Sequence, residues 1–310
     1  MPDDPNEESE KRRTTVTSVG VIGLGQMGLP MARNLMKAGF PVVGYRRGDA
    51  SDFAASGGTV AGSVREVAER CEVILCCLPS AAALEEVVDG PRGLAAGDCA
   101  GRVLVELSTL DTGVKRRMAG RLAERGGEML DCAISGIPRM MEERAGVVFV
   151  SGAGSVAERV QPQLDAISAK VFYMGPFGAA LNAKLCANML VAINIAATAE
   201  TLTLGRKLGI DPMRLYEALK EGAGGSLQFT ARGGRMAAHD WDKVMGSTAT
   251  LAKDIGLIEA RGAETGCPIP VLSAAAELYG LAMAEGHGNR DVAAVYASAI
   301  RRAGLDDGIK

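Results

Sequence analysis

The chain has 310 residues, a length typical of two domains with a substantial hydrophobic core. Its 34 basic and 37 acidic residues give a formal net charge of -3, which argues against nucleic acid or an anionic membrane surface as a partner. The seven cysteines show no metal-ligand spacing, so we expect no metal, reduced thiols and a cytoplasmic location. Residues 1–17 are polar, lack the apolar core of a signal peptide, and are expected to form a disordered tail.

The next segment, residues 19–28, is an apolar run that breaks into spaced glycines. Gly23 can take the backbone angles of a tight turn, Gly25 lets main chain approach a pyrophosphate, and Gly28 lets the following helix pack close to the strand. The free amide groups of that helix would point at the phosphates. This order predicts a dinucleotide site; the alternative is a tight turn in another kind of α/β protein. The residues assigned to the cofactor here are Gly23, Gly25, Gln26, Met27 and Gly28.

The second predicted strand, residues 40–45, ends in Arg46 and Arg47. An acidic side chain at this position would hydrogen-bond the ribose hydroxyl groups of NAD, whereas two guanidinium groups can bind the additional phosphate of NADP. Asp49 and Asp52 follow and are better placed to begin the next helix. We therefore expect NADP rather than NAD as the cofactor, with two solvated arginines as the alternative.

Strands and helices alternate through residues 18–177, which predicts an α/β Rossmann domain with a doubly wound parallel sheet. In such sheets ligands bind beyond the carboxyl ends of the strands. Two expected strands end in Leu78-Pro79 and Ser108-Thr109, and we assign both pairs to the cofactor. Further strands are expected at residues 73–78, 103–107, 128–131, 147–151 and 170–174, and helices at residues 63–70, 111–125 and 156–168.

From residue 178 to about residue 208 the sequence has no proline and no obvious break, which predicts an unusually long helix. Gly209 is expected to end it, and Asp211 with Pro212 to begin another helix. Because only helical patterns follow, we expect residues 178–310 to form an all-helical domain for substrate binding and dimerisation. Asn188 interrupts the apolar stretch of the long helix, which favours a core helix over a membrane span.

Lys184 and Asn188 lie four residues apart in this long helix and therefore project from one face. Both stand in an apolar stretch, where a lysine is expensive to bury. A partly desolvated ammonium could donate the proton that an alkoxide takes up as hydride arrives, and burial would lower its pKa toward the working range. The asparagine could orient a substrate hydroxyl or hold the lysine in place. The alternative is a lysine whose ammonium group reaches solvent.

Taken together, these segments resemble the β-hydroxyacid dehydrogenase family, which includes 3-hydroxyisobutyrate dehydrogenase and 6-phosphogluconate dehydrogenase. The resemblance spans nearly the whole chain after residue 17. It implies an amino-terminal Rossmann domain, a long interdomain helix, an all-helical carboxyl-terminal domain, and assembly as a homodimer or homotetramer. The motifs that carry it, in order, are the glycine turn with residues 27–35, Leu78-Pro79, Ser108-Thr109, Ser135-Gly136, Lys184 with Asn188, and Lys253-Asp254.

The resemblance also implies roles for individual residues. Lys184 would be the general acid and base, assisted by Asn188, and Lys253 would reach the nicotinamide end of the site. The implied reaction moves a hydride between NADP and the alcohol or aldehyde carbon of a small, carboxylate-bearing β-hydroxyacid or semialdehyde. The residues implied to bind that substrate are Ser135, Gly136, Ile137 and Asn188.

The substrate loop departs from the family pattern, since Ile137, Met140 and Arg144 stand where the family has glycine. Three larger side chains must change the backbone or fill the pocket, and Arg139 or Arg144 could instead bind a carboxylate. Two alternatives therefore stay open: the same fold acting on a bulkier or uncharged carbonyl or an imine, and a non-catalytic NADPH-binding protein. The presence of Lys184 argues against both the imine-reducing branch and the non-catalytic alternative.

Overall fold

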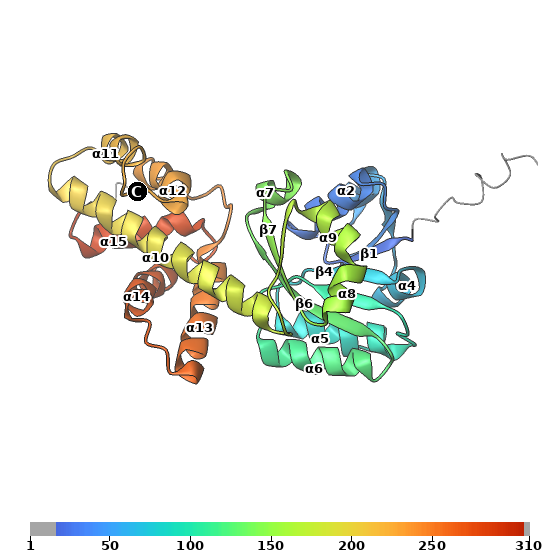
Figure 1. The fold of residues 1–310 in the computed structure, drawn as a ribbon. Coiled ribbons are helices and arrows are strands. Elements are labelled where there is room, and N and C mark those ends of the chain that lie inside the picture. Colours follow the sequence, from blue (N-terminus) through green and yellow to red (C-terminus); the bar gives the residue numbers. More distant parts are fainter. Residues whose placement is uncertain (1–16, 307–310) are drawn as a thin grey trace, which may run out of the picture. The chain divides into compact units, whose positions relative to one another are not determined.

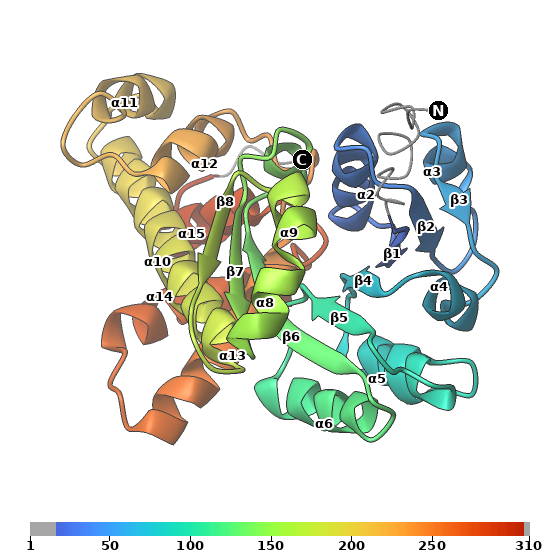
Figure 2. The ribbon, with the colours of Figure 1, turned by 45° about the vertical axis from the view of Figure 1, so that its right-hand side comes forward.

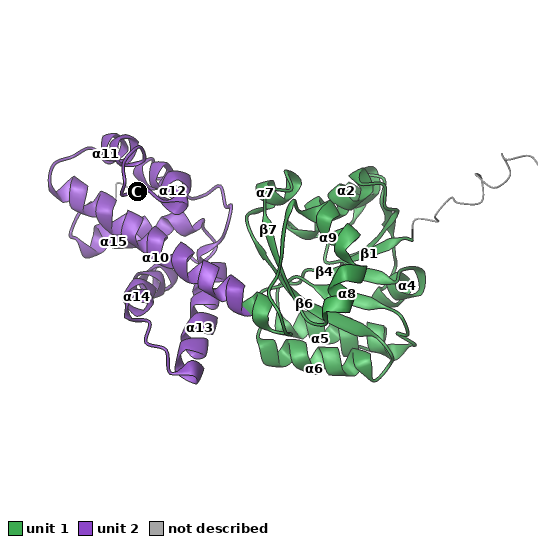
Figure 3. Cartoon of the chain, in the orientation of Figure 1, with its two compact units in different colours: residues 1–181 green, residues 182–310 purple. Residues whose placement is uncertain are grey.

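The computed structural model describes residues 17–306, and these form two compact units, residues 1–181 and residues 182–310 (Figure 3). The predicted tail, residues 1–17, lies outside the described residues apart from Thr17. The boundary falls four residues after the predicted one, inside the first turn of the long helix.

Unit 1 is a sheet with helices on both faces (Figures 1 and 2). Within the described residues the sheet has eight strands in the order β3-β2-β1-β4-β5-β6-β7-β8, and all neighbouring pairs are parallel except β6 with β7. The strands are β1 (Val19–Ile22), β2 (Val42–Tyr45), β3 (Thr59–Val60), β4 (Val73–Cys76), β5 (Val103–Glu106), β6 (Glu128–Ser135), β7 (Val147–Ser151) and β8 (Lys170–Tyr173). The helices are α2 (Gly28–Lys37), α3 (Ser51–Ala55), α4 (Val64–Arg70), α5 (Ala81–Asp89), η1 (Leu94–Ala96), α6 (Thr112–Ala123), α7 (Pro138–Glu142), α8 (Gly154–Arg159) and α9 (Gln161–Ile167).

The central strands are apolar on both sides, which is why helices cover both faces of the sheet. Successive side chains of a strand point to opposite faces, so Leu75 joins a core with α2, α8 and α9, while Ile74 joins a second core with α4, α5 and α6. Burial of side chains of this size contributes about 1.5–3 kcal/mol each. The predicted doubly wound α/β fold is therefore confirmed.

Three local features of unit 1 differ from the sequence prediction. The strand β3 and the helix α5 were not predicted, although Ser80 caps α5 by accepting a hydrogen bond from the amide of Ala83. The single helix expected over residues 156–168 is divided into α8 and α9 at Val160, because Pro162 in the first turn of α9 has no amide hydrogen to continue α8. Within the otherwise parallel sheet, β7 runs antiparallel to its neighbour β6, a detail that the sequence did not predict.

Within the described residues 182–306, unit 2 consists of helices joined by loops, with one isolated bridge between Ser247 and Asp291. By length and composition alone, the long helix α10 could cross a membrane. The buried core helix of a globular protein meets the same two criteria. The helix α10 ends at Gly209, which has a positive φ of 79°, and the side chain of Asp211 then caps the next helix at Arg214, as predicted. The elements are α10 (Ala179–Lys207), α11 (Pro212–Leu219), α12 (Leu227–Ala237), α13 (Thr248–Thr265), α14 (Pro270–Ala284), η2 (Val292–Ala294) and α15 (Val295–Arg302).

Candidate functional site

The glycine turn between β1 and α2 has the geometry of a phosphate-binding turn. Gly23 has a φ of +93°, and a Cβ atom there would lie 2.1 Å from the carbonyl oxygen of Cys77. A Cβ atom on Gly28 would lie 1.9 Å from the carbonyl oxygen of Gly23, whereas a Cβ atom on Gly25 would meet nothing within 4 Å. Two glycines are thus required by close packing, and the third leaves open space over the backbone. No side chain caps α2, so its first-turn amide groups can bind an anion such as a pyrophosphate.

The two strand ends assigned to the cofactor lie beside this turn. The strands β4 and β5 are neighbours, and β4 also pairs with β1, at the point where the strand order reverses. The amide of Leu78 donates a 2.7 Å hydrogen bond to Ser108 Oγ, which joins the two loops directly. The structure therefore brings Leu78, Pro79, Ser108 and Thr109 to the same sheet edge as the glycine turn, where open α/β sheets bind ligands.

The two arginines after β2 have different surroundings. Arg46 forms an ion pair with Asp52 at 2.7 Å and donates a 2.7 Å hydrogen bond to the carbonyl oxygen of Leu24, so it holds the loop beside the glycine turn. Arg47 is exposed, and within residues 17–306 no ion pair or hydrogen bond of its side chain is found. Of the two guanidinium groups, that of Arg47 can engage a phosphate without breaking an existing contact.

The predicted substrate segment follows the end of β6. A Cβ atom on Gly136 would lie 3.2 Å from Gly146 Cα and 3.7 Å from Met140 Sδ, so the larger side chain at residue 140 fills space beside this glycine. Arg144 has a φ of +55°, the left-handed conformation that favours glycine. A backbone conformation that favours glycine is thus occupied here by arginine, at the cost of local strain.

Neither arginine of this loop is free to act as the carboxylate clamp considered above. Arg139 forms an ion pair with Glu143 at 2.8 Å, and its side chain is 80% exposed. The guanidinium group of Arg144 donates to the carbonyl oxygen of Asp165. Both groups are held by residues of unit 1, and these contacts disfavour the clamp.

In unit 2, Lys184 and Asn188 are both buried on α10, 9% and 6% exposed. Asn188 Nδ2 donates a 2.7 Å hydrogen bond to Asp254 Oδ2, and Lys253 Nζ lies 3.1 Å from Asp254 Oδ1. The structure therefore brings together three predicted residues, Lys184, Asn188 and Lys253. It adds the buried carboxylate of Asp254, which was noticed in the sequence only as part of a motif.

The electrostatic surroundings of Lys184 suit proton transfer. Burial lowers the pKa of Lys184 from its ordinary value of 10.5 to about 8, Asp254 opposes the decrease, and Lys253 adds to it. A carboxylate only accepts hydrogen bonds, so the Asn188 amide must turn its nitrogen toward Asp254, which leaves its oxygen as an acceptor. A buried amine that titrates near neutral pH, beside an oriented acceptor, can give or take a proton from a bound hydroxyl group.

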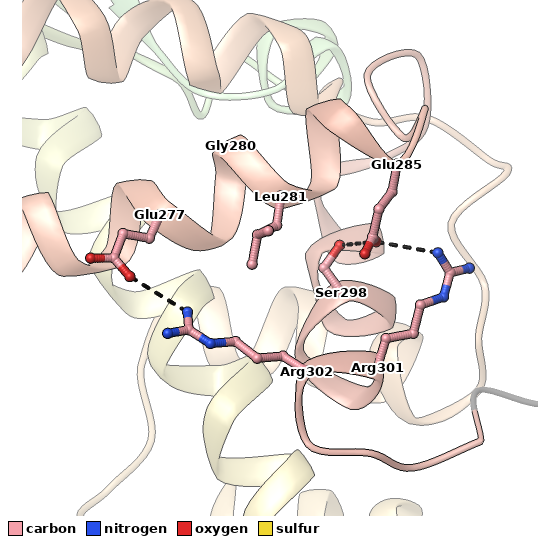
Figure 4. Close-up of a pocket in the computed structure, with 7 residues that line it drawn as sticks. All are labelled: Glu277, Gly280, Leu281, Glu285, Ser298, Arg301 and Arg302. Atoms are coloured by element: carbon pink, nitrogen blue, oxygen red, sulfur yellow. Dashed lines mark hydrogen bonds and ion pairs between the residues drawn. The ribbon is translucent and has the colours of Figure 1, made fainter.

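A surface hollow lies elsewhere in unit 2. It has a volume of about 690 Å³, and α14 and α15 line it (Figure 4). Its charged groups are already paired: Glu285 accepts a 2.6 Å hydrogen bond from Ser298 and pairs with Arg301 at 3.4 Å, and Arg302 pairs with Glu277 at 3.5 Å. None of the residues predicted for the cofactor or the substrate lines this hollow.

Comparisons with known proteins agree with the fold and the motifs. Residues 18–175 match the NAD-binding domain of 6-phosphogluconate dehydrogenase, and residues 178–299 match the NAD-binding domain of NADP-dependent 3-hydroxyisobutyrate dehydrogenase. Mitochondrial 3-hydroxyisobutyrate dehydrogenase of Mus musculus is 32% identical over 289 residues, which cover 90% of this chain and 86% of that protein. L-threonate dehydrogenase of Cupriavidus necator is 32% identical over 281 residues, which cover 90% of this chain and 94% of that protein.

A solved structure shows the same fold over almost its entire length. The crystal structure of 3-hydroxyisobutyrate dehydrogenase from Salmonella typhimurium matches with a TM-score of 0.83 and 26% identity, covering 91% of this chain and 99% of that chain. Two family models together span both units, two relatives exceed 30% identity, and a solved structure shares the fold. The chain therefore belongs to the β-hydroxyacid dehydrogenase family of NAD(P)-dependent oxidoreductases.

Proposed function

We propose that the protein is an NADP-dependent dehydrogenase that moves a hydride between the nicotinamide ring and the alcohol or aldehyde carbon of a small β-hydroxyacid or semialdehyde. The observation that carries this proposal is the buried Lys184, whose pKa is lowered to about 8 beside the oriented amide of Asn188. When an aldehyde is reduced, the ammonium form of Lys184 donates the proton that the new alkoxide takes up. When the alcohol is oxidised, the neutral amine removes that proton.

Each remaining residue of the proposed site has a role consistent with its chemistry. The open space over Gly25 and the uncapped start of α2 suit the cofactor's pyrophosphate, with Gly23, Gln26, Met27 and Gly28 forming the turn. Leu78, Pro79, Ser108 and Thr109 would lie along the rest of the cofactor, and Lys253 near its nicotinamide end. Ser135, Gly136, Ile137 and the free oxygen of Asn188 would hold the substrate.

The preference for NADP is supported by Arg47 more than by Arg46. The exposed guanidinium of Arg47 is available for the additional phosphate of NADP, whereas the guanidinium of Arg46 pairs with Asp52.

The substrate is proposed to be small and to carry a carboxylate, as do 3-hydroxyisobutyrate and L-threonate, for which two of the relatives are named. The filled space beside Gly136 supports a small substrate, because Met140 occupies volume at the end of β6. A bulkier carbonyl substrate is correspondingly disfavoured.

Assembly as a homodimer or homotetramer is supported by the exposed side of α10. Leu190 and Leu204 of α10, and Leu208 just after its end, are 63%, 61% and 69% exposed, and their spacing puts them on one side of the helix axis. A row of exposed leucines on a long helix is typical of a surface that a second subunit covers.

The proposal is tested by nicotinamide absorbance, with oxidised NADP for 3-hydroxyisobutyrate and L-threonate and with NADPH for an uncharged aldehyde and a cyclic imine. We expect turnover of a hydroxyacid by the wild type and its loss in Lys184→Ala, with NADPH binding retained. Turnover of the imine or the uncharged aldehyde alone would favour the broader reductase. Binding of NADPH without turnover of any compound, and no effect of Lys184→Ala, would favour a non-catalytic protein.

A further inference from the structure

Unit 1 contains a lysine with no exposed surface that the proposed chemistry does not use. Lys115 lies on α6, which packs against β6 (Figure 2), and its side chain is 0% exposed. Its Nζ atom is 2.6 Å from Glu106 Oε2 and 2.7 Å from Asp131 Oδ1, and it donates a 3.2 Å hydrogen bond to the carbonyl oxygen of Cys132. Both carboxylates are also fully buried. One ammonium thus joins the end of β5 to the middle of the adjacent strand β6.

Burying three charges is expensive, and well-packed apolar side chains of the same size would often stabilise a fold equally well. Burial alone would lower the pKa of Lys115, but the carboxylates of Glu106 and Asp131 together raise it above its ordinary value. The side chain therefore stays an ammonium. Burial raises the pKa of Glu106, and the Lys115 ammonium opposes that rise. With all three groups ionised the cluster carries a net charge of about -1, because two carboxylates face one ammonium.

One end of the cluster leads to the loops proposed to contact the cofactor. Glu106 Oε1 accepts a 2.9 Å hydrogen bond from the amide of Ser108. Ser108 Oγ in turn accepts the 2.7 Å hydrogen bond from the amide of Leu78. The Lys115 ammonium therefore holds the Glu106 carboxylate. That carboxylate accepts a hydrogen bond from the loop after β5, which in turn is hydrogen-bonded to the loop after β4.

The other end of the cluster caps α10. Asp131 Oδ2 accepts a 3.2 Å hydrogen bond from the amide of Leu181 and lies 3.0 Å from Ser151 Oγ. Ser151 Oγ accepts a 3.0 Å hydrogen bond from the amide of Ala180. The residues just before α10 are Gly175-Pro176-Phe177-Gly178, which supply no capping side chain of their own. The negative cluster also matches the positive end of the helix dipole.

We propose that Asp131, held by Lys115, is a positioning residue that fixes the first turn of α10, from which the helix continues directly to Lys184. Lys184 follows Leu181 by three residues in the same helix, about 4.5 Å along its axis. A shift or fraying of the first turn is transmitted to the lysine because a helix is stiff over one turn. This inference rests on the proposed function, since it assigns Asp131 and Lys115 to the alignment of the proposed acid and base.

The test is Asp131→Asn, with Ser151→Ala as a second variant that leaves all three charges in place. An amide has one acceptor oxygen where the carboxylate has two, so residue 131 could then accept from either Lys115 or the Leu181 amide, but not both. We expect faster hydrogen exchange in the peptide that begins α10 in both variants. For the hydroxyacid that the wild type turns over, we expect kcat to fall about tenfold and the pH midpoint of kcat to move, with the Kd for NADPH unchanged. Asp211→Asn is the matched control, because Asp211 caps α11 through the amide of Arg214 at 2.8 Å and belongs to no buried cluster.

The outcomes separate this inference from the proposed function. If Lys184→Ala abolishes turnover but Asp131→Asn and Ser151→Ala keep the wild-type kcat, pH midpoint and hydrogen exchange, the positioning role is refuted and the proposed function stands. If kcat and NADPH affinity decline by the same factor, the cluster is merely structural and the inference is again refuted. If the wild type turns over no hydroxyacid, the proposed function fails. In that case, unchanged hydrogen exchange at the start of α10 in Asp131→Asn and Ser151→Ala would independently refute the positioning role of Asp131.

Discussion

The most direct test of the proposed chemistry replaces Lys184 with arginine, which keeps the positive charge but does not release its proton at any working pH. Burial lowers the pKa of Lys184 from 10.5 to about 8. At pH 8 about half of such amines are neutral, compared with about 0.3% at a pKa of 10.5, so burial increases the available base by about a hundredfold. An arginine in the same place supplies essentially none.

The direction of the pH dependence follows from the roles of the two forms. Oxidation of a hydroxyacid needs the neutral amine, so its rate should rise with pH and level off above about 8. Reduction of the aldehyde needs the ammonium, so its rate should decline above the same midpoint. Lys184→Arg should slow both directions by about 10²- to 10⁴-fold, the usual contribution of general acid-base catalysis, and should remove the midpoint.

The assay is initial-rate nicotinamide absorbance from pH 6 to 10, with NADPH affinity measured by fluorescence titration. Lys207→Arg is the matched control, because Lys207 is an exposed lysine at the other end of the same helix. The control should behave as the wild type. If Lys184→Arg turned over substrate at the wild-type rate with the same pH midpoint, the proton would have to come from another group, and the mechanism would be refuted.

Three further predictions concern the surroundings of this lysine, the cofactor and the assembly. In Asp254→Asn the carboxylate that opposes the decrease in the Lys184 pKa is gone, so the midpoint of the oxidation profile should move below about 8, and an unchanged midpoint would contradict the assignment. In Arg47→Ala the KM for NADPH should rise about tenfold or more, as expected for the loss of a hydrogen bond to a charged group, while the KM for NADH stays the same. An equal change in both KM values would count against a contact between Arg47 and the additional phosphate. In Leu204→Glu the molar mass measured by light scattering should decrease toward that of one chain, whereas Lys243→Glu, at an exposed lysine outside α10, should leave it unchanged. An unaltered oligomer in Leu204→Glu would exclude this face of α10 as the interface.

The substrate loop shows how far sequence reasoning could go with an unusual pattern. The glycine replacements were expected to change the backbone or to fill the pocket, and the structure shows filled space at Met140 but a glycine-like backbone at Arg144. Arg144 keeps a positive φ of 55°, and the side chain of Met140 packs beside Gly136. Which of the two effects occurs at which residue depends on neighbours such as Gly146, which are not adjacent in sequence and only meet through the β6–β7 pairing.

Features determined by residues close together in the chain could be predicted from the sequence alone. The glycine turn, the end of α10 at Gly209, and the cap at Asp211 depend on backbone angles and hydrogen bonds that span only a few residues. The alternation of short apolar strands with helices similarly determined the fold class, since a strand that is apolar on both faces must be covered on both.

Features that need distant residues to meet were decided by the tertiary structure alone. The carboxylate of Asp254 reaches Asn188 across 66 positions of sequence, and Lys115 finds its two carboxylates on different strands. The pKa of Lys184 is of the same kind, because it depends on how much water the folded chain removes from the amine and on which charges remain nearby. A sequence states which groups are present, but desolvation and charge pairing depend on distances, and those exist only once the chain has folded.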